Sequence, residues 1–228
     1  MYRVILFCVL LLPGTSALAA IMDSEAFINE FHYDNQGSDR LEFVEVVCPE
    51  DWLDQDLLSL TLYNGSSGTT YGRPYGLDRF TLGEVVNGYR LLVLDVSMQN
   101  GAPDGFALAQ DATVLQLLSY EGTFKATNGV AAVLLSTDVG VMELPATPLG
   151  TSLQLSGQGD SYFDFAWQPS VPHTRGYHNL GQTIGSAQAV PEPHSVFIWL
   201  LLGLLAVGLG QVLRSRCAAV GAVSADSR

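Results

Sequence analysis

The sequence predicts an all-β domain, a sandwich or a barrel, lying between an N-terminal export signal and a C-terminal membrane helix. Short β-rich segments separated by Gly, Asn, Asp, Ser and Pro fill the middle of the chain. No long stretch there has apolar residues at the three-and-four spacing of an amphipathic helix. The long apolar runs occur instead at the two ends.

The N-terminal run has the three parts of a secretory signal peptide. Arg3 precedes an apolar core over residues 4–12, which is too short to span a bilayer. Ala17 and Ala19 then place small side chains where a signal peptidase reads the chain. We expect the export machinery and signal peptidase to be partners and residues 1–19 to be removed. An uncleaved N-terminal anchor is the alternative.

The C-terminal run is long enough for one transmembrane helix. Residues 196–213 contain no charged side chain. At about 1.5 Å per residue they make a helix of roughly 27 Å, close to a hydrocarbon core of about 30 Å. Arg214 and Arg216 follow directly and favour the cytoplasmic side. Residues 218–228 are therefore predicted to be a cytoplasmic tail, with the rest of the chain on the other side of the membrane.

The exported part is predicted to be one domain, residues 20–184, followed by an uncharged linker, residues 185–189. The span Ala20–Ala189 has 21 acidic and six basic side chains, a net charge of −15. Such a surface repels phosphate backbones, so a nucleic-acid partner is not expected. It attracts cations, although solubility is the simpler explanation of the charge.

Eight segments of this domain have the composition of strands. The first two, residues 27–33 and 41–47, flank a turn cluster and are expected to form a hairpin. The others are residues 57–65, 89–96, 105–109, 113–120, 131–136 and 152–157. Cys48 is the one cysteine of the exported domain, so it is expected to be a buried thiol outside any internal disulfide.

The segment FINEFHYDNQGSDRLEFVEV, residues 27–46, resembles the opening of a bacterial lamin-tail domain. That family has an Ile-Asn-Glu strand, an Asp-rich turn and a second strand with two Glu residues flanking aliphatic positions. The matching residues here are Ile28, Asn29, Glu30, Asp34, Asn35, Glu42, Phe43, Val44 and Glu45. Residues 77–95 resemble the central strand pair of the family, and residues 151–183 resemble its closing segment, with Arg175 where the family usually has proline. The resemblance implies an immunoglobulin-like β-sandwich.

Residues 190–217 resemble a PEP-CTERM sorting signal, which has a Pro-Glu-Pro triplet, an apolar helix and basic residues in that order. The resemblance implies a Gram-negative bacterium that makes exopolysaccharide, and an exosortase-type membrane protease as partner. The implied sorting residues are Pro191, Glu192, Pro193, Arg214 and Arg216. The two prolines keep the triplet extended, because each lacks an N–H and restricts its predecessor. An ordinary single-pass anchor is the alternative.

Motifs for catalysis are missing from the sequence. It has neither a Gly-x-Ser-x-Gly elbow nor a Gly-rich phosphate loop, so we predict no catalytic, cofactor-binding or metal-binding residue. The turn 34–39 and the pair His173 and His178 are the weak cation candidates. Local hydrogen bonding by the turn side chains is the simpler expectation. His32 is expected to be packed or paired. Glu30 and Glu45 are interpreted as a polar sheet face or as partners of Arg40 and Arg79.

These observations favour an exported, non-enzymatic protein of the cell surface or exopolysaccharide matrix, sorted and processed through its tail. One alternative is a calcium-dependent sugar-binding or adhesive module that uses the first turn and exposed aromatics such as Tyr71 and Tyr75. Another is an accessory module of a secreted nuclease or hydrolase system, although the chain has no room for a nuclease domain of its own.

Overall fold

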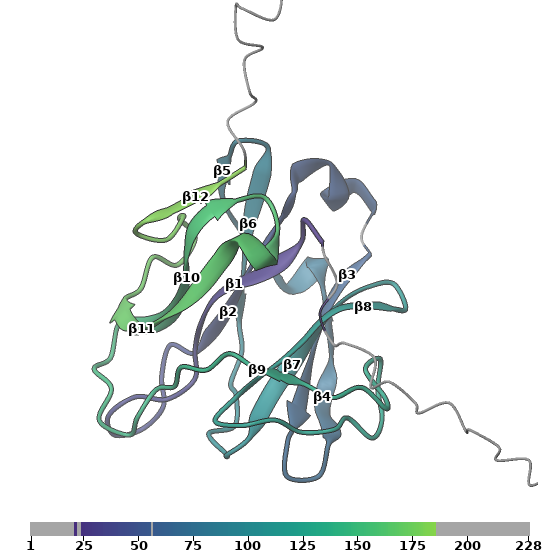
Figure 1. Ribbon diagram of the computed structural model, residues 1–228, viewed down its shortest axis with the longest axis vertical. Coiled ribbons are helices and arrows are strands. Elements are labelled where there is room, and N and C mark those ends of the chain that lie inside the picture. Colours follow the sequence, from purple (N-terminus) through teal and green to yellow (C-terminus); the bar gives the residue numbers. More distant parts are fainter. Residues whose placement is uncertain (1–20, 22–23, 56, 186–228) are drawn as a thin grey trace, which may run out of the picture. The chain divides into compact units, whose positions relative to one another are not determined.

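The computed structural model describes residues 21, 24–55 and 57–185, which form two packed β-sheets without an α-helix (Figure 1). The all-β prediction is confirmed for this part of the chain. The strands are β1 (Phe27–His32), β2 (Phe43–Pro49), β3 (Leu58–Asn64), β4 (Thr69–Gly76), β5 (Thr81–Val86), β6 (Tyr89–Asp95), β7 (Asp104–Gln110), β8 (Thr113–Tyr120), β9 (Thr137–Asp138), β10 (Thr151–Gly159), β11 (Phe165–Pro172) and β12 (Gln182–Ile184). Three short 3-10 helices, η1 (Glu50–Gln55), η2 (Leu77–Arg79) and η3 (Tyr162–Asp164), connect them.

The larger sheet has the order β11-β10-β1-β2-β6-β5, with β12 added beside β10. The smaller sheet has the order β4-β3-β7-β8-β9. The pairs β10–β12 and β8–β9 are parallel and the remaining ladders are antiparallel. Each sheet therefore contains neighbouring strands that are far apart in the sequence, such as β1 and β10, and a hairpin pattern does not predict such pairs.

The predicted β1–β2 hairpin is confirmed, and it contains a bulge between Ile28 and Glu30. The bulge inserts one extra residue, so Ile28 and Phe31 both face the smaller sheet although they are three positions apart. It also turns Glu30 to the outer face, opposite Glu45 of β2. This insertion explains why the alternation of residues 27–33 is imperfect in the sequence.

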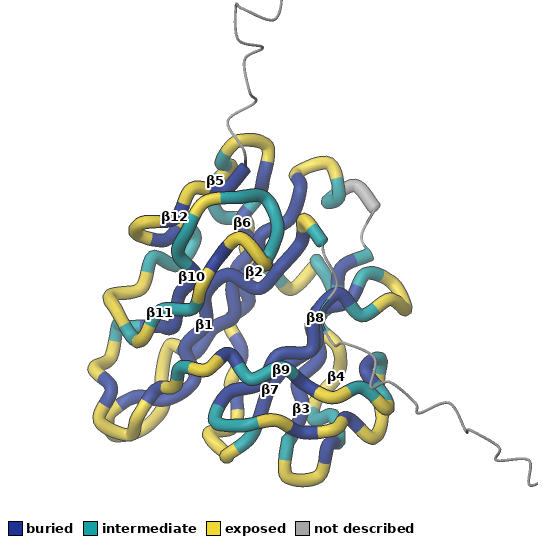
Figure 2. The backbone as a smooth tube through the Cα atoms, in the orientation of Figure 1, coloured by how far each residue is buried: buried dark blue, intermediate teal, exposed yellow. Residues whose placement is uncertain are grey.

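The main core lies between the two sheets, where β1, β2, β3, β6, β7 and β8 are buried along most of their length (Figure 2). Aromatic rings form its centre. Phe31 meets Phe106 and Trp167 edge to face, with ring centroids 5.1 Å apart in each case. Tyr33 stacks on Tyr120 at 4.0 Å. The core of the described domain therefore depends on packing rather than on disulfides.

The outer face of the larger sheet is covered as well. Residues 173–181, which we call the strap, connect β11 to β12 and cross this face. Strap groups form hydrogen bonds with Glu30 of β1, Glu45 of β2 and Glu84 of β5. A second apolar cluster on the same sheet contains Phe27, Phe165 and Ile184 among its members. Strands β1 and β2 are thus buried on both faces, which was not predicted from the sequence.

The prediction of a strand over residues 131–136 is wrong. Val133 has a φ of 72°, and its N–H donates to the Ala126 carbonyl at 2.9 Å, so the segment is a tight turn. Strands β4, β9, β11 and β12 were not predicted. β4 contains Gly72 and Pro74, which the edge position of this strand tolerates.

Cys48 is fully buried as a free thiol, as predicted. Burial raises the pKa of this thiol to about 12, so the side chain stays protonated and unreactive at neutral pH.

Candidate functional site

The residues predicted to direct export and sorting lie outside the described residues. These are Ala17, Ala19, Pro191, Glu192, Pro193, Arg214 and Arg216, together with the apolar run 196–213. In residues 21, 24–55 and 57–185, no helix is both long and apolar enough to cross a bilayer. The same residues contain no group of three or more His, Cys, Asp or Glu side chains placed to hold a metal ion.

The first turn uses its polar side chains to bind its own backbone. Asn35 Oδ1 accepts a hydrogen bond from the Arg40 N–H at 3.0 Å. Asn35 Nδ2 donates to the carbonyls of Gln36 and Ser38 at 3.2 and 3.0 Å. The expectation of local hydrogen bonding is confirmed for this residue.

The aromatic residues named for a calcium-dependent sugar site are not freely exposed. Tyr71 and Tyr75 are half-buried and pack against the main core. The Tyr71 hydroxyl oxygen accepts a hydrogen bond from the Gln99 N–H at 3.1 Å, and burial raises the pKa of this tyrosine to about 12. The expectation of exposed rings at these positions is wrong.

A buried carboxylate, Glu143, fixes the end of β1. Its Oε2 accepts hydrogen bonds from the backbone N–H groups of Tyr33 and Asp34 at 2.7 and 3.0 Å. Its Oε1 lies 2.7 Å from His32 Nδ1, and the Glu143 N–H donates to the Tyr33 hydroxyl oxygen at 2.9 Å. Burial alone lowers the pKa of His32, but the hydrogen bond and charge of Glu143 outweigh it and raise that pKa. The expectation that His32 is packed or paired is confirmed.

Glu30 and Glu45 are the second buried carboxylate group, and both side chains lie under the strap with no exposed surface. Glu30 accepts hydrogen bonds from the Ser152 hydroxyl at 2.5 Å and from the N–H and hydroxyl of Thr174, each at 2.9 Å. Glu45 accepts hydrogen bonds from Asn29 Nδ2 at 2.9 Å and from the Gly176 N–H at 2.6 Å.

The interpretation of these two glutamates as a polar face or as partners of Arg40 and Arg79 is wrong. The strap covers them, and their oxygens bind its backbone. Burial raises the pKa of Glu30, and burial together with the charge of Glu30 raises the pKa of Glu45 well above its usual value. The carboxyl pair therefore holds the strap in place.

This pair gives a stability that depends on pH. A carboxyl whose pKa is raised by folding binds its proton more tightly in the folded state. Its contribution is complete below the unfolded pKa of about 4.3 and is lost as the pH rises through the folded pKa. We expect Glu45→Gln to reduce the loss of stability between pH 4.5 and 8, measured by urea unfolding at several pH values. Glu50→Gln at the surface is the control, and equal pH slopes for both variants would contradict the assignment.

A histidine of the strap pairs with a carboxylate of β5. His178 Nδ1 lies 2.6 Å from Glu84 Oε1 of β5, and the Glu84 N–H donates to the Gly176 carbonyl at 2.9 Å. Arg175 forms an ion pair with Asp95 and lies over the Phe43 ring, 5.4 Å from its centroid. The bond to the Gly176 carbonyl thus gives a partner to one backbone N–H on the β5 edge of the larger sheet, where unpaired backbone groups would otherwise be exposed.

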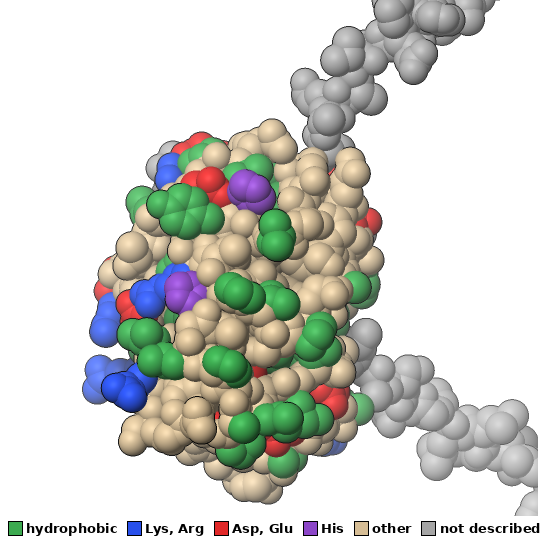
Figure 3. Space-filling model, turned by 90° about the vertical axis from the view of Figure 1, so that its left-hand side faces the viewer, with side chains coloured by type: hydrophobic (Ala, Val, Ile, Leu, Met, Phe, Trp, Pro, Cys, Tyr) green, Lys and Arg blue, Asp and Glu red, His purple; other side chains and the backbone are tan. Residues whose placement is uncertain are grey.

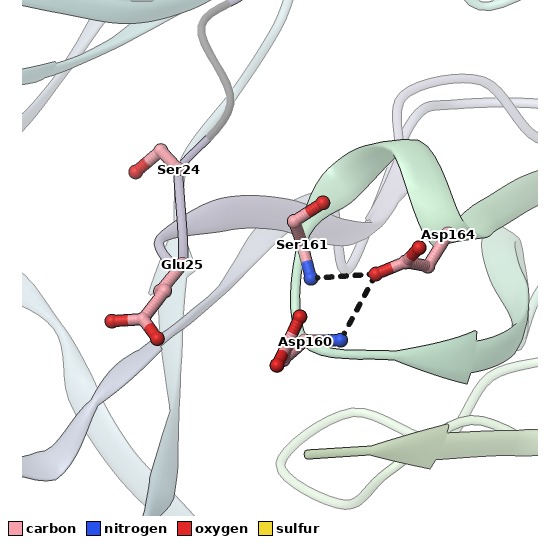
Figure 4. A pocket seen from close by; sticks show the side chains of 5 residues that line it. All are labelled: Ser24, Glu25, Asp160, Ser161 and Asp164. Atoms are coloured by element: carbon pink, nitrogen blue, oxygen red, sulfur yellow. Dashed lines mark hydrogen bonds between the residues drawn. The ribbon is translucent and has the colours of Figure 1, made fainter. Parts of the chain in front are cut away.

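An open acidic pocket of about 400 Å³ lies beside η3 (Figure 4). It is lined by Ser24, Glu25, Asp160, Ser161 and Asp164. Asp164 Oδ2 accepts hydrogen bonds from the N–H groups of Asp160 and Ser161, each at 3.1 Å, and so closes its own turn. Figure 4 shows Glu25 on a separate segment of chain, away from this pair of bonds. The Asp164 carboxylate in this pocket is therefore explained by its bonds to the backbone of its own turn.

Another concave site is a groove of about 600 Å³ between β10, β11 and the strap. Its lining includes Gln154, Gln168, Val171, His173 and Leu180. Figure 3 shows the side of the molecule on the left of Figure 1, where β11 and β12 lie. Hydrophobic and uncharged surface fills the middle of this face, and charged side chains gather toward its margins. No sequence motif pointed to this groove.

Comparison with known proteins adds no relative. No protein-family model matches the chain, and neither a curated protein nor a solved structure matches it.

Proposed function

We propose that this protein is an exported, non-enzymatic component of the cell surface or of an exopolysaccharide matrix. An immunoglobulin-like sandwich of the lamin-tail type would be its exported part. A PEP-CTERM tail would deliver it to an exosortase-type protease. The observation that carries the proposal is the order of Pro191-Glu192-Pro193, the apolar run 196–213 and the two arginines, Arg214 and Arg216.

The described domain supports a scaffold role. Its deeply buried carboxylates, Glu30, Glu45 and Glu143, accept hydrogen bonds from backbone groups that they hold in place. The calcium-dependent alternative loses support, because Asn35 is used by its own loop and because Tyr71 and Tyr75 are packed. An accessory role in a nuclease or hydrolase system would need a second protein to supply the chemistry.

Deleting Pro191–Pro193 is expected to stop sorting. The native host would express the tagged full chain, and cell fractions would be compared with and without the triplet. We expect the wild-type protein at the cell surface or in the matrix and the deletion variant retained in the inner membrane. A variant lacking residues 187–189 controls for the shortened linker. Normal surface delivery of the triplet deletion would contradict the proposal.

A further inference from the structure

We propose that the groove between β10, β11 and the strap binds an uncharged saccharide unit without the help of a metal ion. This inference rests on the proposed function, because a location at the cell surface or in the matrix is what would bring the protein into contact with a polysaccharide. The volume of the groove, about 600 Å³, lies in the range of small-ligand sites, roughly 300–1,000 Å³. Three separate segments build it, namely residues 154–156, 168–174 and 180–181.

The charge of the lining excludes ionic ligands. No Asp, Glu, Lys or Arg side chain lines the groove, although the exported span carries a net charge of −15. An anionic polymer is repelled by that surface, and a cationic ligand finds no carboxylate in the groove to pair with. The ligand that fits is therefore uncharged.

The polar groups of the lining select a ligand with hydroxyl groups. The Oε1 atom of Gln168, the Ser156 hydroxyl and the His173 ring form no hydrogen bond with any described residue. A purely aliphatic ligand would remove these groups from water without replacing their hydrogen bonds, which is unfavourable. Sugar hydroxyls both donate and accept, so they match a lining of acceptors and mixed groups.

The apolar part of the lining fits the C–H face of a sugar ring. Leu180 is 87% exposed and Val171 is 36% exposed, so both side chains offer aliphatic surface at the groove. An extended peptide is disfavoured, because Pro169 and Pro172 remove backbone donors from β11, which is an edge strand of the larger sheet.

The floor of the groove is held in one geometry by the buried carboxylate beneath it. Gln154 Nε2 donates to Glu30 Oε1 at 3.2 Å and to the Pro172 carbonyl at 2.9 Å. The amide is therefore fixed, and because Gln154 is only 2% exposed it forms the base of the groove beneath the more exposed polar groups. Glu30 also holds Thr174 of the strap wall, so it is a positioning residue for the site.

Native electrophoresis of the full chain in mild detergent tests the proposal, with a neutral glucan, a neutral mannan or a polyuronate cast in the gel and EDTA present throughout. We expect at least one neutral polymer to slow the wild-type protein roughly twofold. A Kd of about 1 mM leaves half of the protein bound at an equal concentration of sugar units. Leu180→Asp adds a charge to the groove wall and is expected to abolish the retardation. Phe163→Asp adds the same charge at a site that is 61% exposed and outside the groove, and should be retarded like the wild type.

Several outcomes would overturn the proposal. Migration unchanged by both neutral polymers, or retardation by the polyuronate alone, would contradict the ligand class. Equal retardation of Leu180→Asp and wild type would place binding elsewhere. Retardation that appears only when calcium replaces EDTA would favour the metal-dependent alternative, and competition by a neutral Leu-Pro peptide would assign the groove to peptides. Because the test uses purified full-length protein, its failure is distinguishable from a failure of sorting in the host.

Discussion

Glu143→Ala is expected to lower the free energy of unfolding by about 3 to 4 kcal/mol, because it leaves several buried polar groups without a partner. The N–H groups of Tyr33 and Asp34 lose their acceptor, and His32 loses its carboxylate. For a domain of this length the midpoint of thermal unfolding should fall by about 10 °C. The segment between β9 and β10 would also lose its attachment to β1.

Urea unfolding of the full chain in detergent, followed by tryptophan fluorescence, measures this effect. Met142→Ala is the matched control, because Met142 is the preceding residue and is 52% exposed. Its effect should stay within about 0.5 kcal/mol. Glu143→Gln keeps an acceptor for the backbone and should fall between the two. If Glu143→Ala cost no more than Met142→Ala, the described hydrogen bonds would not stabilise the fold.

Phe31→Ala is expected to cost about 4 kcal/mol, because it removes the ring that joins the aromatic groups of the main core. Phe31 has no exposed surface, and its ring lies 5.1 Å from both Phe106 and Trp167. The cavity left behind lies between the two sheets, where neither backbone can move inward without breaking ladder hydrogen bonds.

The same unfolding measurement applies, with Phe163→Ala as control. Phe163 has the same side chain but is 61% exposed in η3, so its removal should change stability by less than about 0.5 kcal/mol. Similar costs for the two alanine variants would mean that Phe31 does not lie at the centre of the core.

The sequence predicted those parts of the fold that local patterns encode. The β1–β2 hairpin was predicted because two β-rich segments flank one turn cluster, and the buried thiol of Cys48 because apolar residues surround it. Strand β12 has three residues and pairs in parallel with β10, Gly157 facing Gln182. Such a pairing leaves no periodicity to detect. The apolar run 131–136 was wrongly predicted to be a strand, because Val133 adopts a left-handed conformation that the composition does not reveal.

The site residues were harder to predict than the strands. Glu30 and Thr174 are 144 positions apart, so the burial of Glu30 depends on a strap that no local pattern places over β1. One signal was available, because aliphatic residues flank Glu45 on both sides, as is typical of a strand buried on both faces. The sequence contained no signal for the groove, since its three segments meet only in the folded chain.

The central claim is that both ends of the chain direct export and that the domain between them is a scaffold. The intact mass of the mature protein, purified from the native host envelope, tests it most directly. We expect a polypeptide that begins at Ala20 and ends before the apolar run 196–213. A mass in that fraction equal to the whole chain from Met1 to Arg228 would contradict it.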